Sequence, residues 1–415
     1  MSVQQMCAAA QRASRVLAGL PRVRKDEALG NVADALARRS AEILAENAED
    51  VRLARENRLP DALVDRLLLD EDRLRDVAAS VRVLAALPDP IGQLVDGWRL
   101  KNGIELRKVR VPLGVVAVIY EARPNVTVDA ACLCLKTGNA VILRGGSAAM
   151  HSNRILSEVV QGAVIEADLP REAVSYLTPD RRELDELLEQ RRYVDLVIPR
   201  GGEDLKNYLM DRSKVPVIYA AGGNCHVYVD AAADLDKAVP IIINAKCQRP
   251  GVCNAAETLL VHRDVAAAFL PRAVGELKRR GVELVVDKTA ADVLDDPTLK
   301  RANKTHYETE FLALKLAVRV VDSLDEALEH IATYGTRHSE AIVTEDLGAA
   351  RRFTAEVDAA CVYVNASTRF TDGGELGLGA EMGISTQKLH ARGPISLEEL
   401  TCVKYELWGD GQVRA

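Results

Sequence analysis

The chain has 415 residues, of which 48% are hydrophobic and 28% are charged, a composition typical of soluble globular proteins. This length exceeds what one hydrophobic core usually supports, so we expect two or three domains. A formal net charge of −7, with no basic stripe bearing aromatic residues, argues against a nucleic-acid partner.

Residues 1 to about 87 are predicted to be helical, because apolar residues recur at three- and four-residue spacing. From Gly92 to Pro112 the pattern changes to alternation around Asn102-Gly103, which is a strong hairpin signal. An exposed hairpin either protects its own edge or pairs with a partner chain.

The segment 114–229 alternates short apolar strands with helices, which indicates an open parallel sheet. Two Arg-Gly-Gly turns, at Arg144 and Arg200, follow predicted strands and offer backbone N–H groups and a cation to a phosphate. One such turn is most often an ordinary strand-to-helix turn, whereas two equivalent copies favour a nucleotide site. No GxGxxG fingerprint follows a strand, so we do not expect the ordinary Rossmann binding mode.

Residues 230–385 repeat the alternation of strands and helices, which predicts a second α/β domain. No Pro-Gly linker separates the two domains, so we expect them to be closely joined, with a cleft between them. The end of the chain, from Ser396 to Trp408, returns to alternation and can add a strand to a sheet.

Cys253 follows a Pro250-Gly251 turn between two apolar segments, which places its thiol on a loop held by rigid elements. Lys246 and Arg249 lie nearby in sequence, and positive charge lowers the pKa of a thiol. The stretch therefore fits a reactive nucleophile. Taken alone, it fits a small buried apolar residue more often.

The eight cysteines are too dispersed for a disulfide scaffold, and no His/Cys spacing suits zinc, so we expect no metal site. The N-terminus lacks the apolar core of a signal peptide, and no apolar run is long enough to span a membrane. We therefore expect a cytoplasmic protein without a membrane partner.

Several long motifs identify a family. They are GVVAVIYEARPNVT at 114–127, QRPGVCN at 248–254, and VNASTRFTDGG at 364–374 running into STQKLHARGP at 385–394. Over essentially its whole length the chain resembles the γ-glutamyl phosphate reductases (glutamate-5-semialdehyde dehydrogenases), a branch of the aldehyde dehydrogenase superfamily.

The resemblance implies NADPH-dependent reduction of L-glutamyl 5-phosphate to L-glutamate 5-semialdehyde and phosphate, the second step of proline biosynthesis, through a thioester on Cys253. Asn125, in the loop after the first strand, resembles an asparagine of the oxyanion hole. Arg144 replaces a lysine that contacts the adenosine ribose and its 2′-phosphate, and arginine there favours NADPH over NADH. Gly201 corresponds to the glycine turn under the pyrophosphate, and Glu310 to a glutamate that binds the nicotinamide ribose.

The resemblance also bears on what attacks the thioester. Oxidising relatives carry a water-activating glutamate two residues before a Gly-Gly pair, where this chain has Ala220. A thioester that exchanges with phosphate needs no such base, so the departure supports acyl-phosphate reduction. Arg369 and Arg249 are candidates for binding the anionic groups of the substrate, and structural ion pairs are an equal alternative for both.

The expected domains are a cofactor-binding domain (1–93 and 111–229), a catalytic domain (230–387) and an oligomerisation flap (94–110 and 388–415). The hairpin and the C-terminal strand resemble the oligomerisation flap of the superfamily, and this resemblance implies a homo-oligomer, a dimer or larger. Channelling of the substrate from glutamate 5-kinase is a further hypothesis. Two alternatives stay open: a reductase of another acyl phosphate with the same mechanism, and a non-catalytic subunit that retains the fold.

Overall fold

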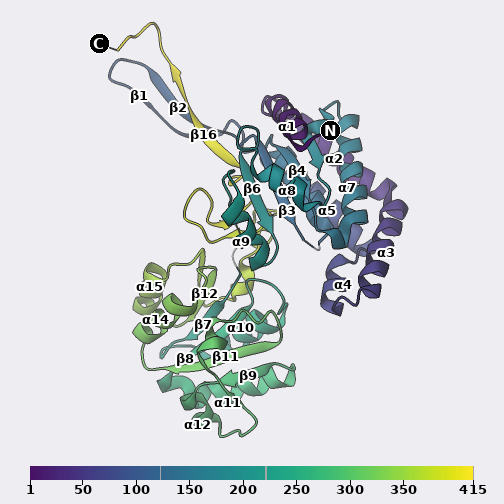
Figure 1. Ribbon diagram of the computed structural model, residues 1–415. Coiled ribbons are helices and arrows are strands. Elements are labelled where there is room, and N and C mark those ends of the chain that lie inside the picture. Colours follow the sequence, from purple (N-terminus) through teal and green to yellow (C-terminus); the bar gives the residue numbers. More distant parts are fainter. Residues whose placement is uncertain (122, 220–221, 415) are drawn as a thin grey trace. The chain divides into compact units, whose positions relative to one another are not determined.

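The computed structural model describes residues 1–121, 123–219 and 222–414. The chain divides into two compact units (Figure 1). In the described ranges, unit 1 consists of residues 1–121, 123–219, 377–383 and 395–414, and unit 2 consists of residues 222–376 and 384–394. The expected fold class is confirmed, since each unit contains a parallel sheet with helices and unit 1 also carries a small antiparallel sheet.

Unit 1 begins with helices, as the apolar spacing predicted. They are α1 (Val3–Leu17), α2 (Arg22–Arg38), α3 (Ser40–Glu56), α4 (Asp61–Leu67) and α5 (Glu71–Ala86). A capping box starts α1, where the Ser2 hydroxyl accepts from the Gln5 backbone N–H and the Gln5 side chain accepts from the Ser2 backbone. None of the helices in the described ranges is long and apolar enough to cross a membrane.

The main sheet of unit 1 is parallel, with strand order β5-β4-β3-β6. Its strands are β3 (Val115–Tyr120), β4 (Ala140–Arg144), β5 (Val174–Tyr176) and β6 (Leu196–Arg200). The helices that alternate with them are α6 (Asn125–Lys136), α7 (Met150–Glu166), α8 (Arg181–Leu188) and α9 (Glu203–Arg212). Every residue of β3 is buried, as expected for a central strand covered on both faces. The carboxyl ends of β3, β4 and β6 therefore lead into the loops that carry candidate site residues.

Unit 2 is built on a longer parallel sheet with strand order β10-β9-β11-β8-β7-β12-β13. The strands are β7 (Cys225–Val229), β8 (Ala256–His262), β9 (Glu283–Val286), β10 (Lys300–Arg301), β11 (Lys315–Val321), β12 (Ser339–Val343) and β13 (Cys361–Val364). The helices are α10 (Leu235–Cys247), α11 (Arg263–Arg279), α12 (Lys288–Leu294), α13 (Lys304–Glu308), α14 (Leu324–Tyr334) and α15 (Leu347–Glu356). A core cluster of unit 2 packs α10 and α11 against the sheet around Phe269.

Three elements differ from the sequence-based expectation. Strand β15 (Gly393–Pro394), expected in the oligomerisation flap over 388–415, instead pairs with β14 (Ile384–Ser385) in unit 2. Strand β7 was expected in the first domain, but it pairs with β8 and β12 in the sheet of unit 2. Its apolar pattern predicts a buried strand, and this pattern carries no information about which sheet buries it. Within the segment 114–229, where strands and helices were expected to alternate, the apolar residues 217–219 form no strand, and Val217 makes an isolated bridge with Val197.

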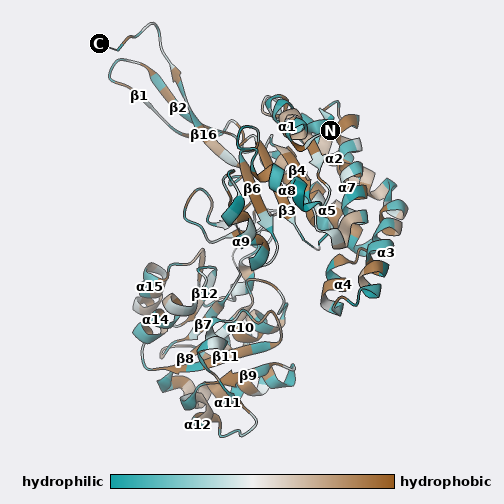
Figure 2. Ribbon diagram, viewed as in Figure 1, coloured by the Kyte–Doolittle hydropathy of each residue, from teal (hydrophilic) through white to brown (hydrophobic). Residues whose placement is uncertain are grey.

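The Asn-Gly hairpin is confirmed. Strand β1 (Leu94–Arg99) pairs with β2 (Glu105–Pro112), and β16 (Thr401–Trp408) pairs with the other edge of β2, all antiparallel. We call this three-stranded sheet the flap. Hydrophobic, brown segments lie along the ribbon of these strands (Figure 2). Large side chains exposed on the flap are Leu94, Val95, Trp98, Tyr405, Leu407 and Trp408. The flap therefore presents apolar surface that unit 1 itself does not cover.

Candidate functional site

The loop that carries Cys253 connects the end of α10 to the start of β8. A fully buried ion pair closes its base, with Lys246 Nζ 2.6 Å from Glu257 Oε2. Burial raises the pKa of Glu257 to about 7, although the Lys246 charge opposes the shift. Burial also lowers the pKa of Lys246. Lys246 was expected to act on the thiol, but its ammonium is instead committed to Glu257.

The backbone of Cys253 is packed against Gly223. A Cβ atom on Gly223 would overlap the carbonyl oxygen of Cys253. The same carbonyl oxygen accepts a hydrogen bond from the Cys225 thiol at 3.2 Å. The Gly223 N–H donates to Glu310 Oε1 at 2.7 Å, so Glu310, the predicted ribose ligand, also fixes the segment beside the nucleophile. Only a residue without a side chain fits at Gly223.

We call the segment 248–255, which carries Cys253, the nucleophile loop. Arg369 and Asn254 connect this loop to the 3-10 helix Thr368–Phe370. Arg369 Nε donates to Gln248 Oε1 at 2.7 Å, and Nη1 donates to Asn254 Oδ1. The Asn254 amide in turn donates to the carbonyl oxygen of Thr371 at 2.8 Å. Burial lowers the pKa of Arg369, as does the positive charge of Arg249, while the Cys253 thiol acts in the opposite direction. Within unit 2, Arg249 and Cys253 therefore both act electrostatically on Arg369.

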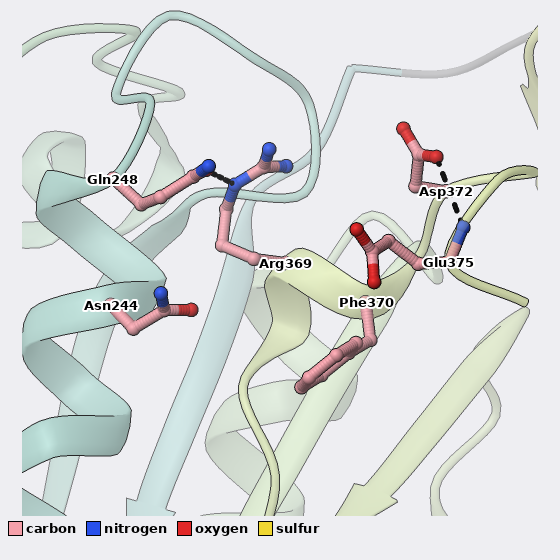
Figure 3. A pocket seen from close by; sticks show the side chains of 6 residues that line it. All are labelled: Asn244, Gln248, Arg369, Phe370, Asp372 and Glu375. Carbon is pink, nitrogen blue, oxygen red and sulfur yellow. Dashed lines mark hydrogen bonds between the residues drawn. The ribbon is translucent and has the colours of Figure 1, made fainter.

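A cavity of about 170 Å³ opens beside this connection. Helix α10, the nucleophile loop and the segment after β13 contribute its lining residues, which Figure 3 shows as sticks: Asn244, Gln248, Arg369, Phe370, Asp372 and Glu375. The lining combines one guanidinium with two carboxylates, two amides and an aromatic ring. It can therefore bind a ligand that carries both charges.

Asn125 is the first residue of α6, not part of a loop as the sequence suggested. Pro124 is the N-cap residue and already has helical φ and ψ angles, so the helix begins at Asn125. The Asn125 amide donates to Asp129 Oδ2 at 2.9 Å, one helical turn later. Burial raises the pKa of Asp129 to about 6, opposed by this hydrogen bond and by the charge of Arg200.

Arg144 and Gly201 lie at the carboxyl ends of β4 and β6. Arg144 Nη2 donates to the carbonyl oxygen of Pro179 at 3.0 Å, and burial lowers its pKa. Its Nε is buried without a hydrogen-bond partner among the described residues. At the second Arg-Gly-Gly turn, the Gly202 N–H donates to Glu121 Oε2 at 3.1 Å, so a carboxylate already accepts the hydrogen bond of this amide. A Cβ on Gly201 would come within 2.6 Å of Glu121 Cδ.

Ala220, whose identity bears on the attacking group, lies outside the described residues. Four residues of the site were not predicted from the sequence: Asn254, Gln248, Glu257 and Asp129. The one local signal in the sequence that could have indicated Asn254 is its position next to Cys253. Its partner Arg369 is 115 positions away in sequence.

Comparison with known proteins shows extensive similarity. The model of the aldehyde dehydrogenase family matches residues 1–293. The γ-glutamyl phosphate reductase of Moorella thermoacetica is 55% identical, over 100% of this chain and 99% of its own, and that of Thermobifida fusca is 53% identical, over 99% and 98%. The crystal structure of γ-glutamyl phosphate reductase from Thermotoga maritima is 44% identical, covers 100% of both chains and has a TM-score of 0.97.

Replacing Gly223 by alanine should lower kcat/KM by at least about a hundredfold, because the new methyl group must displace the backbone of Cys253. Gly275→Ala is the matched control, since a Cβ there in α11 meets nothing within 4 Å. The control should retain activity and melt at the same or a slightly higher temperature. Full activity in a folded Gly223→Ala variant would contradict the described packing.

Proposed function

The chain belongs to the aldehyde dehydrogenase family, in its γ-glutamyl phosphate reductase branch, and on this premise we propose that it reduces L-glutamyl 5-phosphate to L-glutamate 5-semialdehyde. The reaction is an NADPH-dependent oxidoreduction that releases phosphate and serves proline biosynthesis. One observation carries the proposal: Cys253 stands on a loop fixed at its base and at its neighbour Asn254, beside a cavity of mixed charge. The full-length identity to γ-glutamyl phosphate reductases supports the choice of substrate.

In the proposed mechanism the Cys253 thiolate attacks the acyl carbon of the substrate, a C–S bond forms, and the C–O bond to phosphate breaks. The side-chain amide of Asn125 and a backbone N–H stabilise the oxyanion of the tetrahedral intermediate. The hydrogen bond to Asp129 uses one amide hydrogen of Asn125 and leaves the other for the oxyanion. When bound, the cofactor supplies the hydride that reduces the resulting thioester.

The cofactor site is assigned to Arg144, Gly201 and Glu310. Arg144 fits a 2′-phosphate, because its buried Nε lacks a partner among the described residues and a guanidinium binds phosphate with two hydrogen bonds. This supports NADPH over NADH. The turn at Gly201 offers an amide that now binds the Glu121 carboxylate, an anion where a pyrophosphate oxygen would bind. Glu310 is assigned to the nicotinamide ribose.

Phosphate, not water, is proposed as the partner of the acyl-enzyme. The sequence has Ala220 where oxidising relatives have a general base. Without a base to activate it, water attacks the thioester slowly, so the acyl group is preserved for phosphate or for reduction. Arg249 and Arg369 are the proposed ligands of the anionic groups of the substrate.

We assign self-association to the flap. Its outer strands expose apolar side chains, and the free edge of β1 can pair with another strand. This supports a homo-oligomer, a dimer or larger. The eight free cysteines fit a reducing cytoplasm. Channelling from glutamate 5-kinase is kept as a hypothesis, which co-purification of the two enzymes would test.

The function is tested by adding L-glutamate 5-semialdehyde, phosphate and NADP⁺ and following NADPH absorbance. Cys253→Ala should abolish this turnover and still bind NADPH, because only the nucleophile is lost. Cys402→Ala, on the exposed flap, is the matched control and should retain activity. Turnover of Cys253→Ala above roughly a few per cent would contradict the assigned role. Parallel assays with L-aspartate 4-semialdehyde and with acetaldehyde, the aldehydes that correspond to aspartyl and acetyl phosphate, test for a reductase of another acyl phosphate.

Replacing Arg144 by alanine should lower the preference for NADPH over NADH by about tenfold, because the charge-assisted contact with the 2′-phosphate is lost. The measurement is kcat/KM for each cofactor in wild type and variant. Equal losses with both cofactors would show that Arg144 does not read the 2′-phosphate.

Introducing charge on the flap should weaken self-association. A Trp98→Glu, Leu407→Glu variant places two carboxylates on the exposed apolar surface, where desolvation opposes contact. Light scattering after size-exclusion chromatography should show a smaller species than wild type. An unchanged mass would exclude this surface from the interface.

A further inference from the structure

The cavity beside the nucleophile loop carries opposite charges on facing walls. The guanidinium of Arg369 lies on one side, and the segment with Asp372 and Glu375 forms another. In Figure 3 the Glu375 side chain extends from its loop toward Arg369 and the ring of Phe370. A ligand with a cation and an anion close together is complementary to this arrangement, whereas a dianion would be repelled by the two carboxylates.

Arg369 is fixed in a way that leaves one nitrogen for a ligand. Its Nε and Nη1 donate to Gln248 and Asn254, which sets the plane of the guanidinium. Among the hydrogen bonds of the described residues, Nη2 has no acceptor. Since Arg369 is only half-buried, this nitrogen can donate to a carboxylate placed in the cavity.

The Glu375 carboxylate can receive a cation from the cavity, and its negative charge also acts on Arg369. The loop that carries Glu375 is held in place. Asp372 Oδ1 accepts from the backbone N–H of Gly374 at 2.9 Å and from that of Glu375 at 3.4 Å. Asp372 therefore shapes the turn, while the Glu375 carboxylate makes no ion pair within the described ranges. Of the two acidic residues, Glu375 is the one available to a ligand.

We propose that this cavity binds the amino-acid end of the substrate, with the α-carboxylate on Arg369 and the α-ammonium on Glu375. The inference rests on the proposed function and deepens it by naming Glu375 as a specificity residue. It also separates the two candidate arginines. Arg249 is not among the residues that line the cavity, so it is not assigned to this end of the substrate.

This arrangement would select substrates by their amine. An acyl phosphate without an α-ammonium leaves Glu375 unpaired beside the incoming α-carboxylate, and like charges at that range repel. A substrate of the same length without the α-carboxylate leaves Arg369 without a bound anion. Discrimination therefore comes from both charges, and each can be removed separately.

The test compares two aldehydes in the phosphate-dependent direction: L-glutamate 5-semialdehyde, and 5-oxopentanoate, which lacks only the amine. Wild type should prefer the amine-bearing aldehyde. Glu375→Gln should lower kcat/KM for L-glutamate 5-semialdehyde by roughly tenfold, mainly through KM. For 5-oxopentanoate it should leave kcat/KM unchanged or raise it, since the repelling carboxylate is gone. Glu345→Gln, an exposed carboxylate outside the cavity, is the matched control and should change neither value.

Equal losses with both aldehydes, or no loss with either, would overturn the assignment of Glu375. The exposed position of Glu375 means that the variant should fold, and an unchanged melting temperature verifies this. A wild-type enzyme that forms NADPH from neither aldehyde in the presence of phosphate would instead contradict the proposed function. The two failures are therefore distinguishable.

Discussion

The proposed chemistry depends on how tightly the backbone around Cys253 is held. The buried Lys246–Glu257 pair closes the loop at its base, Gly223 packs against the Cys253 carbonyl, and Asn254 ties the far side to the 3-10 helix. A buried ion pair adds little net stability by itself, but breaking one strands a charge in the interior. These contacts limit where the thiol can lie, which is the requirement for a nucleophile that must approach an acyl carbon at a defined distance and angle.

The charges around this loop match an amino acyl phosphate better than a simple aldehyde. Arg369 is positioned by two amide oxygens, so its guanidinium is oriented before a ligand arrives. Glu375 adds the opposite charge in the same cavity. Orientation fixed in advance lowers the entropy lost on binding. The site is therefore prepared for one end of the substrate by contacts that belong to the fold.

Much of the fold could be predicted from the sequence, because apolar periodicity and Asn-Gly turns are local signals. The parallel sheets and the hairpin follow from them, and Cys253 stands out by its Pro-Gly turn. Sheet membership of β7 could not be predicted, because a strand's pattern does not identify its neighbours. Nor could the partners of Lys246 and Arg369, since these contacts form only when distant segments pack together.

In the proposed mechanism the Cys253 acyl-enzyme reacts with phosphate and resists attack by water. Mixing enzyme with L-glutamate 5-semialdehyde and NADP⁺ without phosphate, and following NADPH in a stopped-flow instrument, tests this most directly. We expect a burst of about one NADPH per active site and then almost no turnover, until added phosphate restores a steady rate. Steady turnover without phosphate would contradict it, because hydrolysis would then release the acyl group.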